Sequence, residues 1–383
     1  MVLRNLQEIT HDSIIDLQVT DGYITAVGAV SAGGNSDIYF EHAIVFPGLI
    51  NSHDHLDFNL FPQLGNRIYK NYVEWGEDIH LQDKEIIDAV LKVPSHLRVR
   101  WGMYKNLLNG ITTVVNHAPR LSVADDLLTV FQDCYTLHSV QLEKGWKYKL
   151  NDLIARRIPY VIHAGEGTDE SSHYEIDNLI RWNLWNRSIV AVHGIAMNER
   201  QAESFKALVW CPSSNFFLIG NTAPVERLKN RTNMLFGTDS TVSAQWDIWA
   251  QLRTALSTQK ASPEELYKML TVQPARVWKL KKSGQLKNHY DADIVVAKQK
   301  NDLTGYNAFY AIAPQDILLV MRKGKVKLFD ESILDQVNAN IDLNTFSQIS
   351  LGDSIKYIYG DLPGLMSEIR EYYPDAIFPC KVY

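Results

Sequence analysis

The sequence predicts an α/β fold, a TIM-type (β/α)8 barrel with a small β-sandwich domain formed from both chain ends. Three observations favour this architecture. Short apolar runs alternate with longer helical patterns through the middle of the chain, as in repeated βα units. Hairpin signals occupy the first forty-odd residues, and β character returns at 291–296 and 317–320. The length of 383 residues fits one barrel-sized domain and a small companion.

The amino-terminal segment predicts a β-hairpin, because Asp21-Gly22 separates two β-rich runs, 13–19 and 23–28. Asp-Gly in this position is the strongest short hairpin signal. We predict four segments along the chain. They are residues 1–46 (small β domain, first part), 47–284 (metal-dependent hydrolase barrel), 285–332 (small β domain, second part) and 333–383 (a C-terminal extension of unknown role).

Eight apolar runs are predicted to be barrel strands, and eight parallel strands close into a barrel. The runs are 45–50, 111–115, 127–131, 135–142, 160–162, 189–192, 207–210 and 234–236. Only about fifty residues separate Thr113 from Ile162, so the helices between these strands must be short or missing. A helix is predicted over 263–270, where Ser262 suits the N-cap and Pro263 the first helical position. Another is predicted over 362–373, ending before Pro374.

Composition excludes several classes of protein. The net charge of -6 and the pI near 6.1 give no basic footprint, so we expect no nucleic-acid partner. The longest apolar runs reach about eight residues, far from the roughly 20 needed to span a bilayer, so no membrane partner is expected. Cys134, Cys211 and Cys380 are scattered and form neither a disulfide framework nor a metal motif. With no sign of a signal peptide, a cytoplasmic location is the expectation.

Histidines and carboxylates follow four of the predicted strands, and in a barrel these positions meet at one mouth. They are His53 and His55, His163 and Glu166, His193, and Asp239. The i, i+2 spacing puts His53 and His55 on one face of their strand, whereas Asp54 should face away. Three imidazoles and one carboxylate make a plausible site for Zn²⁺ or Fe²⁺ with room for a water.

With these motifs, the chain resembles the amidohydrolase superfamily, in the branch that holds cytosine, guanine and methylthioadenosine/S-adenosylhomocysteine deaminases and triazine chlorohydrolases. The resemblance runs from Asp21 to about Gly324. The motifs that carry it are 47–55 (Pro-Gly-Leu-Ile-Asn-Ser-His-Asp-His), 110–114 (Gly-Ile-Thr-Thr-Val), 163–166 (His-Ala-Gly-Glu), 211–215 (Cys-Pro-Ser-Ser-Asn), 223–225 (Ala-Pro-Val), 237–240 (Gly-Thr-Asp-Ser), 271–276 (Thr-Val-Gln-Pro-Ala-Arg) and 292–296 (Ala-Asp-Ile-Val-Val). Order and spacing match best from 211 to 240.

The resemblance implies a metal site. His53, His55, His163 and Asp239 would bind one divalent ion, Zn or Fe, which lowers the pKa of its water and makes hydroxide. Two-metal relatives carry a bridging Lys or Glu at the fourth strand. The predicted fourth strand, 135–142, contains neither residue, so we expect a single ion.

The resemblance also implies the reaction. Asp239 would accept a proton from the water, Glu166 would carry a proton to a ring nitrogen, and His193 would hydrogen-bond the attacking water or the tetrahedral oxygen. We therefore expect hydrolytic deamination of a small nitrogen heterocycle. One alternative is a cyclic amide hydrolase of the imidazolonepropionase type. Another is a metal-binding protein without activity, which the intact Glu166 and Asp239 argue against.

Four residues are candidates for substrate binding. Trp75 lies in the long loop after the first strand, where a planar heterocycle would stack on its ring. His117 ends the second strand, His138 lies in the fourth, and Asn215 ends the motif 211–215. Packing in the core is the competing interpretation for Trp75 and the two histidines. Relatives are often dimers, so a homodimer is expected by analogy alone.

Overall fold

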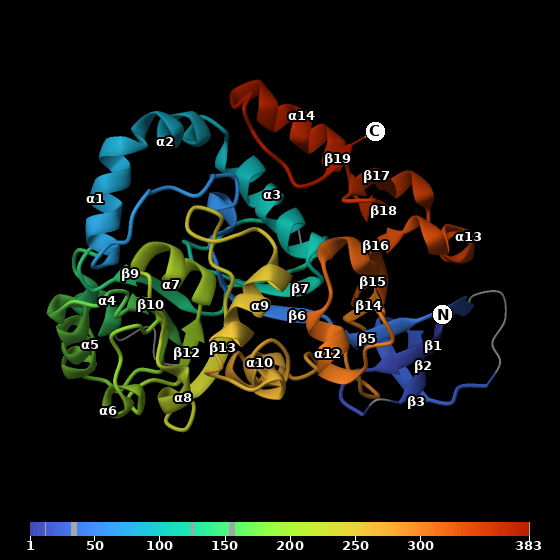
Figure 1. Cartoon of the computed structure of the whole chain (residues 1–383), viewed down its shortest axis with the longest axis horizontal. Coiled ribbons are helices and arrows are strands. Elements are labelled where there is room, and N and C mark those ends of the chain that lie inside the picture. Colours follow the sequence, from blue (N-terminus) through green and yellow to red (C-terminus); the bar gives the residue numbers. More distant parts are fainter. Residues whose placement is uncertain (12, 32–36, 124–125, 153–157, 383) are drawn as a thin grey trace.

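The computed structural model describes residues 1–11, 13–31, 37–123, 126–152 and 158–382. Two parallel sheets fill the middle of the chain (Figure 1). Their strand orders are β13-β12-β11-β10-β9 and β6-β7-β8. Their strands are β6 (Leu49–Asp54), β7 (Ile111–Asn116), β8 (Thr129–Phe131), β9 (Tyr135–Ser139), β10 (Tyr160–Ala164), β11 (Ile189–His193), β12 (Ala207–Trp210) and β13 (Asn233–Phe236). Each strand overlaps one of the eight predicted runs.

The first predicted run divides at Gly48 into two strands of different sheets. Residues before it form β5 (Ala43–Pro47), and residues after it form β6. A Cβ at Gly48 would lie 2.2 Å from Thr112 Oγ1, so only glycine allows this close approach to β7. The bend directs β6 and its histidines into the parallel sheet.

Helices connect most of the parallel strands and pack around them. They are α1 (Tyr72–Gln82), α2 (Lys84–Leu91), α3 (Ser95–Leu108), α4 (Trp146–Leu150), α5 (Glu170–Trp182), α6 (Glu199–Ala202), α7 (Pro212–Ile219), α8 (Val225–Leu228), α9 (Ile248–Ser257), α10 (Pro263–Lys268) and α11 (Val272–Val277). Within the described residues, α4 is the only helix between β7 and β10. This agrees with the prediction of short or missing helices there. Ser262 caps α10 as predicted, in a capping box with Glu265.

Strands from both chain ends form one further sheet, in the order β19-β17-β18-β16-β15-β14-β5-β1-β2-β3, with β4 beside β1. Besides β5, they are β1 (Val2–Glu8), β2 (Ile14–Thr20), β3 (Tyr23–Gly28), β4 (Asp37–Tyr39), β14 (Ile294–Lys298), β15 (Ile317–Arg322), β16 (Lys325–Asp330), β17 (Phe346–Leu351), β18 (Ser354–Tyr359) and β19 (Lys381–Val382). β14 pairs antiparallel with β5 and joins the two ends. This pairing does not by itself show two facing sheets, so the sandwich stays a prediction, as do the domain limits.

The last fifty residues also contact the first part of the chain. Three helices accompany the larger sheet: α12 (Gly305–Tyr310), α13 (Leu334–Val337) and α14 (Leu362–Tyr372). The same part of the chain has the 3-10 helices η2 (Pro314–Asp316), η3 (Glu331–Ile333), η4 (Asn338–Asn340) and η5 (Leu343–Thr345). A further 3-10 helix, η1 (Leu56–Phe58), follows β6. Phe378 packs edge-on against Trp101 of α3, with ring centroids 4.8 Å apart. The helix predicted over 362–373 corresponds to α14, which ends one residue earlier than predicted.

In the described ranges, no helix combines the length and the apolar character that a bilayer crossing requires.

Candidate metal centre and pocket

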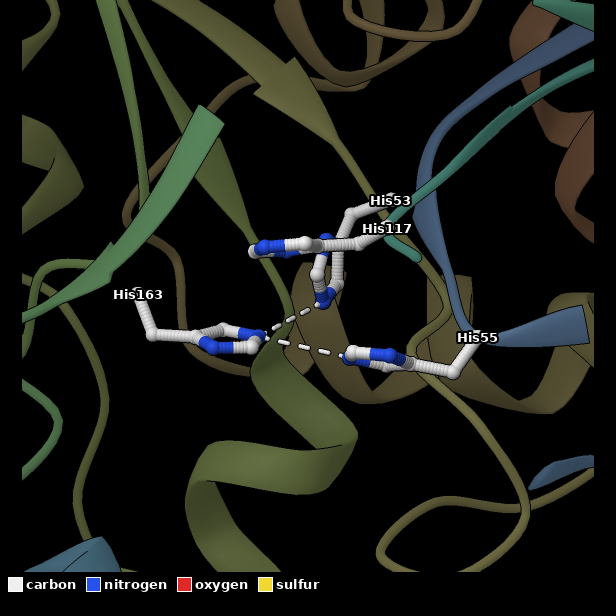
Figure 2. Close-up of side chains that lie close together, drawn as sticks. All are labelled: His53, His55, His117 and His163. Atoms are coloured by element: carbon white, nitrogen blue, oxygen red, sulfur yellow. Dashed lines mark hydrogen bonds between the residues drawn. The ribbon is translucent and has the colours of Figure 1, made fainter. Parts of the chain in front are cut away.

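The four predicted metal ligands lie together at the carboxyl ends of the parallel strands. His163 Nε2 lies 3.3 Å from His55 Nε2 and 3.3 Å from His53 Nε2 (Figure 2). Asp239 Oδ1 lies 3.7 Å from His53 Nε2 and 3.9 Å from His55 Nε2. Strand β6 and the residue after it supply two of these side chains, β10 supplies the third, and the turn after β13 supplies Asp239.

These donor atoms fit a cation. His163 Nδ1 donates to the carbonyl of His138 at 2.8 Å, so its Nε2 carries a lone pair toward the other two rings. Burial is the largest cause that lowers the pKa of His53 and of His163 well below the usual value, and the neighbouring imidazoles lower it further. The low pKa favours neutral rings, whose nitrogen lone pairs can bind a cation. Three imidazole nitrogens and a carboxylate oxygen around one point suit a divalent metal ion.

His117 joins this cluster, which we call the imidazole cluster (His53, His55, His117 and His163). Its ring stacks on that of His163 with centroids 4.3 Å apart, and one nitrogen of each of the four rings lies within 4.8 Å of the others. His117 Nε2 donates to the Leu137 carbonyl at 3.0 Å, and its buried Nδ1 has no hydrogen-bond partner among the described residues. Predicted as a substrate-binding candidate, His117 therefore lies where a metal ligand would lie.

Asp239 is held in an unusual backbone conformation. Its φ of +57° lies in the left-handed region, which costs free energy for a residue other than glycine. Its Oδ2 accepts hydrogen bonds from Ser214 Oγ at 2.8 Å and Ser243 Oγ at 3.0 Å, and its Oδ1 accepts from the Ser240 amide. Burial would raise the pKa of Asp239, but the nearby imidazoles of His193 and His55 and the hydrogen bonds lower it, so the carboxylate stays ionised.

Asp54 faces away from the imidazole cluster, as strand alternation predicts. Its Oδ2 accepts from Asn106 at 2.7 Å and pairs with Lys105 Nζ at 3.1 Å, and all three side chains are buried. Lys105 Nζ also lies 3.3 Å from the carbonyl oxygen of Asp239. Helix α3 therefore ties the back of β6 to the turn that carries Asp239. Lys105 was not predicted as a partner of Asp54, because helical spacing alone does not indicate which lysine faces inward.

Glu166 and His193 form the second part of the site. His193 Nε2 lies 3.5 Å from Glu166 Oε2, and His193 Nδ1 donates to Asn215 Oδ1 at 2.8 Å. Burial, then the charges of Asp239 and Glu175, raise the pKa of Glu166 well above its usual value. Asn215, a predicted substrate-binding residue, is buried behind His193 and does not line the cavity, so its position suits orienting that ring.

A cavity of about 310 Å³ opens over these residues. Its floor includes His55, His163, His193, Glu166 and Asp239. Two predicted substrate-binding residues, Trp75 and His138, line it as well. Most of the remaining wall is apolar, and much of it comes from the loop after β6 and from helices α1 and α2. Phe58, Phe61 and Leu64 of that loop were not predicted from the sequence to line the cavity. The two aromatic residues so soon after His55 could have indicated it.

Comparisons with known proteins agree with this fold. The 5-methylthioadenosine/S-adenosylhomocysteine deaminase of Pyrococcus furiosus is 23% identical, over 91% of this chain and 100% of that protein. The enzyme of the same name from Caldicellulosiruptor saccharolyticus is 28% identical over 45% of this chain and 47% of that protein.

Solved structures with the same fold include deaminases. An adenosine deaminase from Xanthomonas campestris with bound Zn has a TM-score of 0.73 at 17% identity and covers 97% of each chain. Helicobacter pylori aminofutalosine deaminase, solved with methylthio-coformycin, has a TM-score of 0.66 at 14% identity and covers 85% of this chain and 99% of that one. The profile of the Amidohydrolase family matches residues 111–327. Because this match spans more than half of the 383 residues, the chain belongs to the amidohydrolase family.

Proposed function

We propose that this protein is a metal-dependent hydrolase that deaminates a small nitrogen heterocycle and releases ammonia. One observation carries the proposal. The Nε2 atoms of His53, His55 and His163 converge with Asp239 on one point, next to the Glu166–His193 pair and inside one cavity. Membership of the amidohydrolase family and the deaminases among its relatives support hydrolysis of a carbon–nitrogen bond.

The proposed cofactor is one divalent ion, Zn²⁺ or Fe²⁺, held by His53, His55, His163 and Asp239. The bound zinc in the Xanthomonas campestris adenosine deaminase structure, which has this fold, favours Zn²⁺. When bound, the ion supplies Lewis-acid chemistry and lowers the pKa of a water molecule. The position of His117 beside these ligands makes it a candidate to contact the ion or the water.

The side chains around the ion have separate proposed tasks. Asp239, ionised in its buried setting, accepts a proton from the attacking water. The raised pKa of Glu166 favours the protonated form of its carboxyl, which can donate that proton to a ring nitrogen. His193, oriented by Asn215, hydrogen-bonds the oxygen as it adds to carbon.

The steps balance as a hydrolysis. The oxygen of water forms a bond to the amidine-like carbon, and the ring nitrogen gains the proton of Glu166. One proton of the water passes through Asp239 to the amino group, the bond from carbon to that group breaks, and ammonia leaves. The remaining proton of the added hydroxyl passes to Glu166 and restores its carboxyl, so the product has a ring carbonyl where the substrate had its amino group.

A substrate panel tests the proposal. Purified protein loaded with Zn²⁺ or Fe²⁺ is incubated with aminopurines, aminopyrimidines, aminopterins and aminotriazines, and ammonia is measured by a coupled assay. We expect ammonia together with a ring carbonyl product from at least one class. Ring-opened products from cyclic amides without ammonia would replace deamination by the imidazolonepropionase-type alternative.

We also propose that the eight parallel strands close into one barrel. Two hydrogen bonds across the β13–β6 seam support closure, from the Asp239 amide to the His53 carbonyl at 3.1 Å and from the Thr238 amide to Asn51 Oδ1 at 3.0 Å. On the other side, where β8 and β9 are the edge strands, His117 after β7 donates from its Nε2 to the Leu137 carbonyl of β9 and links the two sheets. The homodimer and the cytoplasmic location stay predictions, and light scattering of the purified protein tests the first.

A further inference from the structure

The walls of the cavity differ in chemistry from its floor. Apart from the floor, the lining is dominated by aliphatic and aromatic side chains, among them Phe58, Phe61, Trp75, Ile79, Leu142 and Leu218. Phe58 stacks on the ring of His55, with centroids 5.6 Å apart and planes 18° from parallel. A flat heterocycle above the floor would therefore meet aromatic faces, and any group attached to it would extend along apolar walls.

Three polar donors of the walls already have partners inside the protein, whereas Ser240 Oγ, beside the floor, has no hydrogen-bond partner among the described residues. Tyr72 Oη donates to Glu175 Oε2 at 3.0 Å, and Trp75 Nε1 donates to the Leu64 carbonyl at 2.9 Å. His80 Nδ1 donates to the Gly76 carbonyl at 2.7 Å. These three donors would have to break an existing hydrogen bond before they could bind a polar substituent of the substrate.

Charged groups are confined to the floor. Among the described residues that line the cavity, none is Lys or Arg, and the carboxylates are Glu166 and Asp239, which the proposed chemistry uses. A carboxylate or a row of hydroxyls on the substrate would leave water for walls that offer no cation and few free polar atoms, which disfavours binding. An apolar substituent would instead gain from burial.

We infer that the substrate is an uncharged aminoheterocycle with an apolar substituent, such as an alkyl, alkylthio or aryl group. This inference rests on the proposed function and narrows its substrate class. A sugar with free hydroxyls, or a tail that carries a carboxylate, is selected against. The polar floor recognises the reacting amidine, and the walls select the substituent.

A matched substrate series tests this inference. Each heterocycle that releases ammonia in the panel is compared with alkyl substituents from methyl to butyl, and with two polar substituents of the same length as butyl: trihydroxybutyl and carboxypropyl. For 6-aminopurine the substituent is placed on N9. We expect kcat/KM to rise roughly fourfold per methylene from methyl to butyl. It should fall at least tenfold for the trihydroxybutyl compound and at least a hundredfold for the carboxylate.

Two variants locate the selection in the wall. Leu142 lines the cavity and is 49% exposed, so Leu142→Arg places a cation at the rim without filling the core. The matched control is Leu184→Arg, because Leu184 is 66% exposed and does not line the cavity. We expect Leu142→Arg to raise the carboxypropyl-to-butyl ratio of kcat/KM at least tenfold, and Leu184→Arg to leave the ratio unchanged.

The possible outcomes distinguish a failure of this inference from a failure of the proposed function. Equal or faster deamination of the hydroxylated or carboxylated compounds by the unmodified protein would overturn the apolar-substituent inference and leave deamination intact. No ammonia from any heterocycle would overturn the proposed function, and the inference with it. The unmodified protein alone decides the substrate order, so a variant that fails to fold does not leave the question open.

Discussion

The carboxyl groups of Glu166 and Asp239 have pKa values shifted in opposite directions, and their surroundings explain why. Burial, then the charges of Asp239 and Glu175, raise the pKa of Glu166. Asp239 is equally buried, but the imidazoles of His193 and His55 and the hydroxyl of Ser214 lower its pKa. Such a pair divides into one proton donor and one proton acceptor, as general acid–base chemistry requires.

The variant Glu166→Gln tests this division at the residue scale. We expect the variant to bind the metal as before, because Glu166 is not among the four proposed ligands. Turnover should fall by about 10²–10⁴-fold, since the amide cannot exchange the proton. Metal content by elemental analysis and ammonia release are measured together, with the exposed Glu199→Gln as control. Full activity in Glu166→Gln would show that another group carries the proton.

At the scale of elements, the strand-end rule located the site from sequence. Parallel strands place their carboxyl ends together, so His53, His163 and Asp239 could be grouped although they lie far apart in the chain. The apolar runs also located all eight strands. The predicted boundary between residues 46 and 47 lies close to the division at Gly48, but the exact position depends on the close approach of β6 to Thr112 in another strand. Such a contact cannot be predicted from the residues next to Gly48 in the sequence.

Other parts of the site depend on packing that sequence patterns do not report. Lys105 lies on α3, and only the docking of this helix behind β6 brings its ammonium to Asp54 and to the Asp239 carbonyl. His117 was assigned to the substrate, whereas the fold stacks it on His163. Asn215 was expected to face the substrate, and the fold turns it toward His193. Tertiary structure sets the partners of all three residues, and contact of His117 or Asn215 with a substrate stays a prediction.

The pair Lys105–Asp54 joins two elements, and its loss should be costly. Lys105→Met leaves the buried Asp54 carboxylate without its cation, which should lower the free energy of unfolding by about 3–5 kcal/mol. Urea unfolding measures the change. The double variant Lys105→Met/Asp54→Asn should recover part of the loss, because it removes the unpaired charge.

An exposed ion pair provides the control for the Lys105 and Asp54 variants. Lys84 and Asp88 pair across one turn of α2 with both side chains largely exposed. Lys84→Met should change the free energy of unfolding by less than about 1 kcal/mol. A similarly small effect for Lys105→Met would contradict the role assigned to the buried pair.

At the scale of the whole molecule, one buried acid should make stability depend on pH. Burial raises the pKa of Glu175 to about 7 from the usual 4.5, although hydrogen bonds from the Gly165 amide, Tyr72 and Gln141 oppose the shift. The folded protein therefore binds this proton more tightly than the unfolded chain does. The favourable contribution is complete below pH 4.5 and is lost as the pH rises through about 7.

Glu175→Gln removes this titration. Relative to the variant, the unmodified protein should lose about 3 kcal/mol of stability between pH 4.5 and pH 8, which is the shift in pKa converted to free energy. Urea unfolding of both proteins at pH 5 and pH 8 gives the two differences. Equal differences at the two pH values would mean that the pKa of Glu175 is the same in the folded and the unfolded states.

Deamination by this protein should depend on a metal ion at the site of His53, His55, His163 and Asp239. Ammonia release by chelator-treated, metal-free protein is measured as Zn²⁺ or Fe²⁺ is added back, with a substrate identified in the panel. We expect no activity without metal and full recovery at one equivalent of ion per chain. Undiminished ammonia release by the metal-free protein would contradict this expectation.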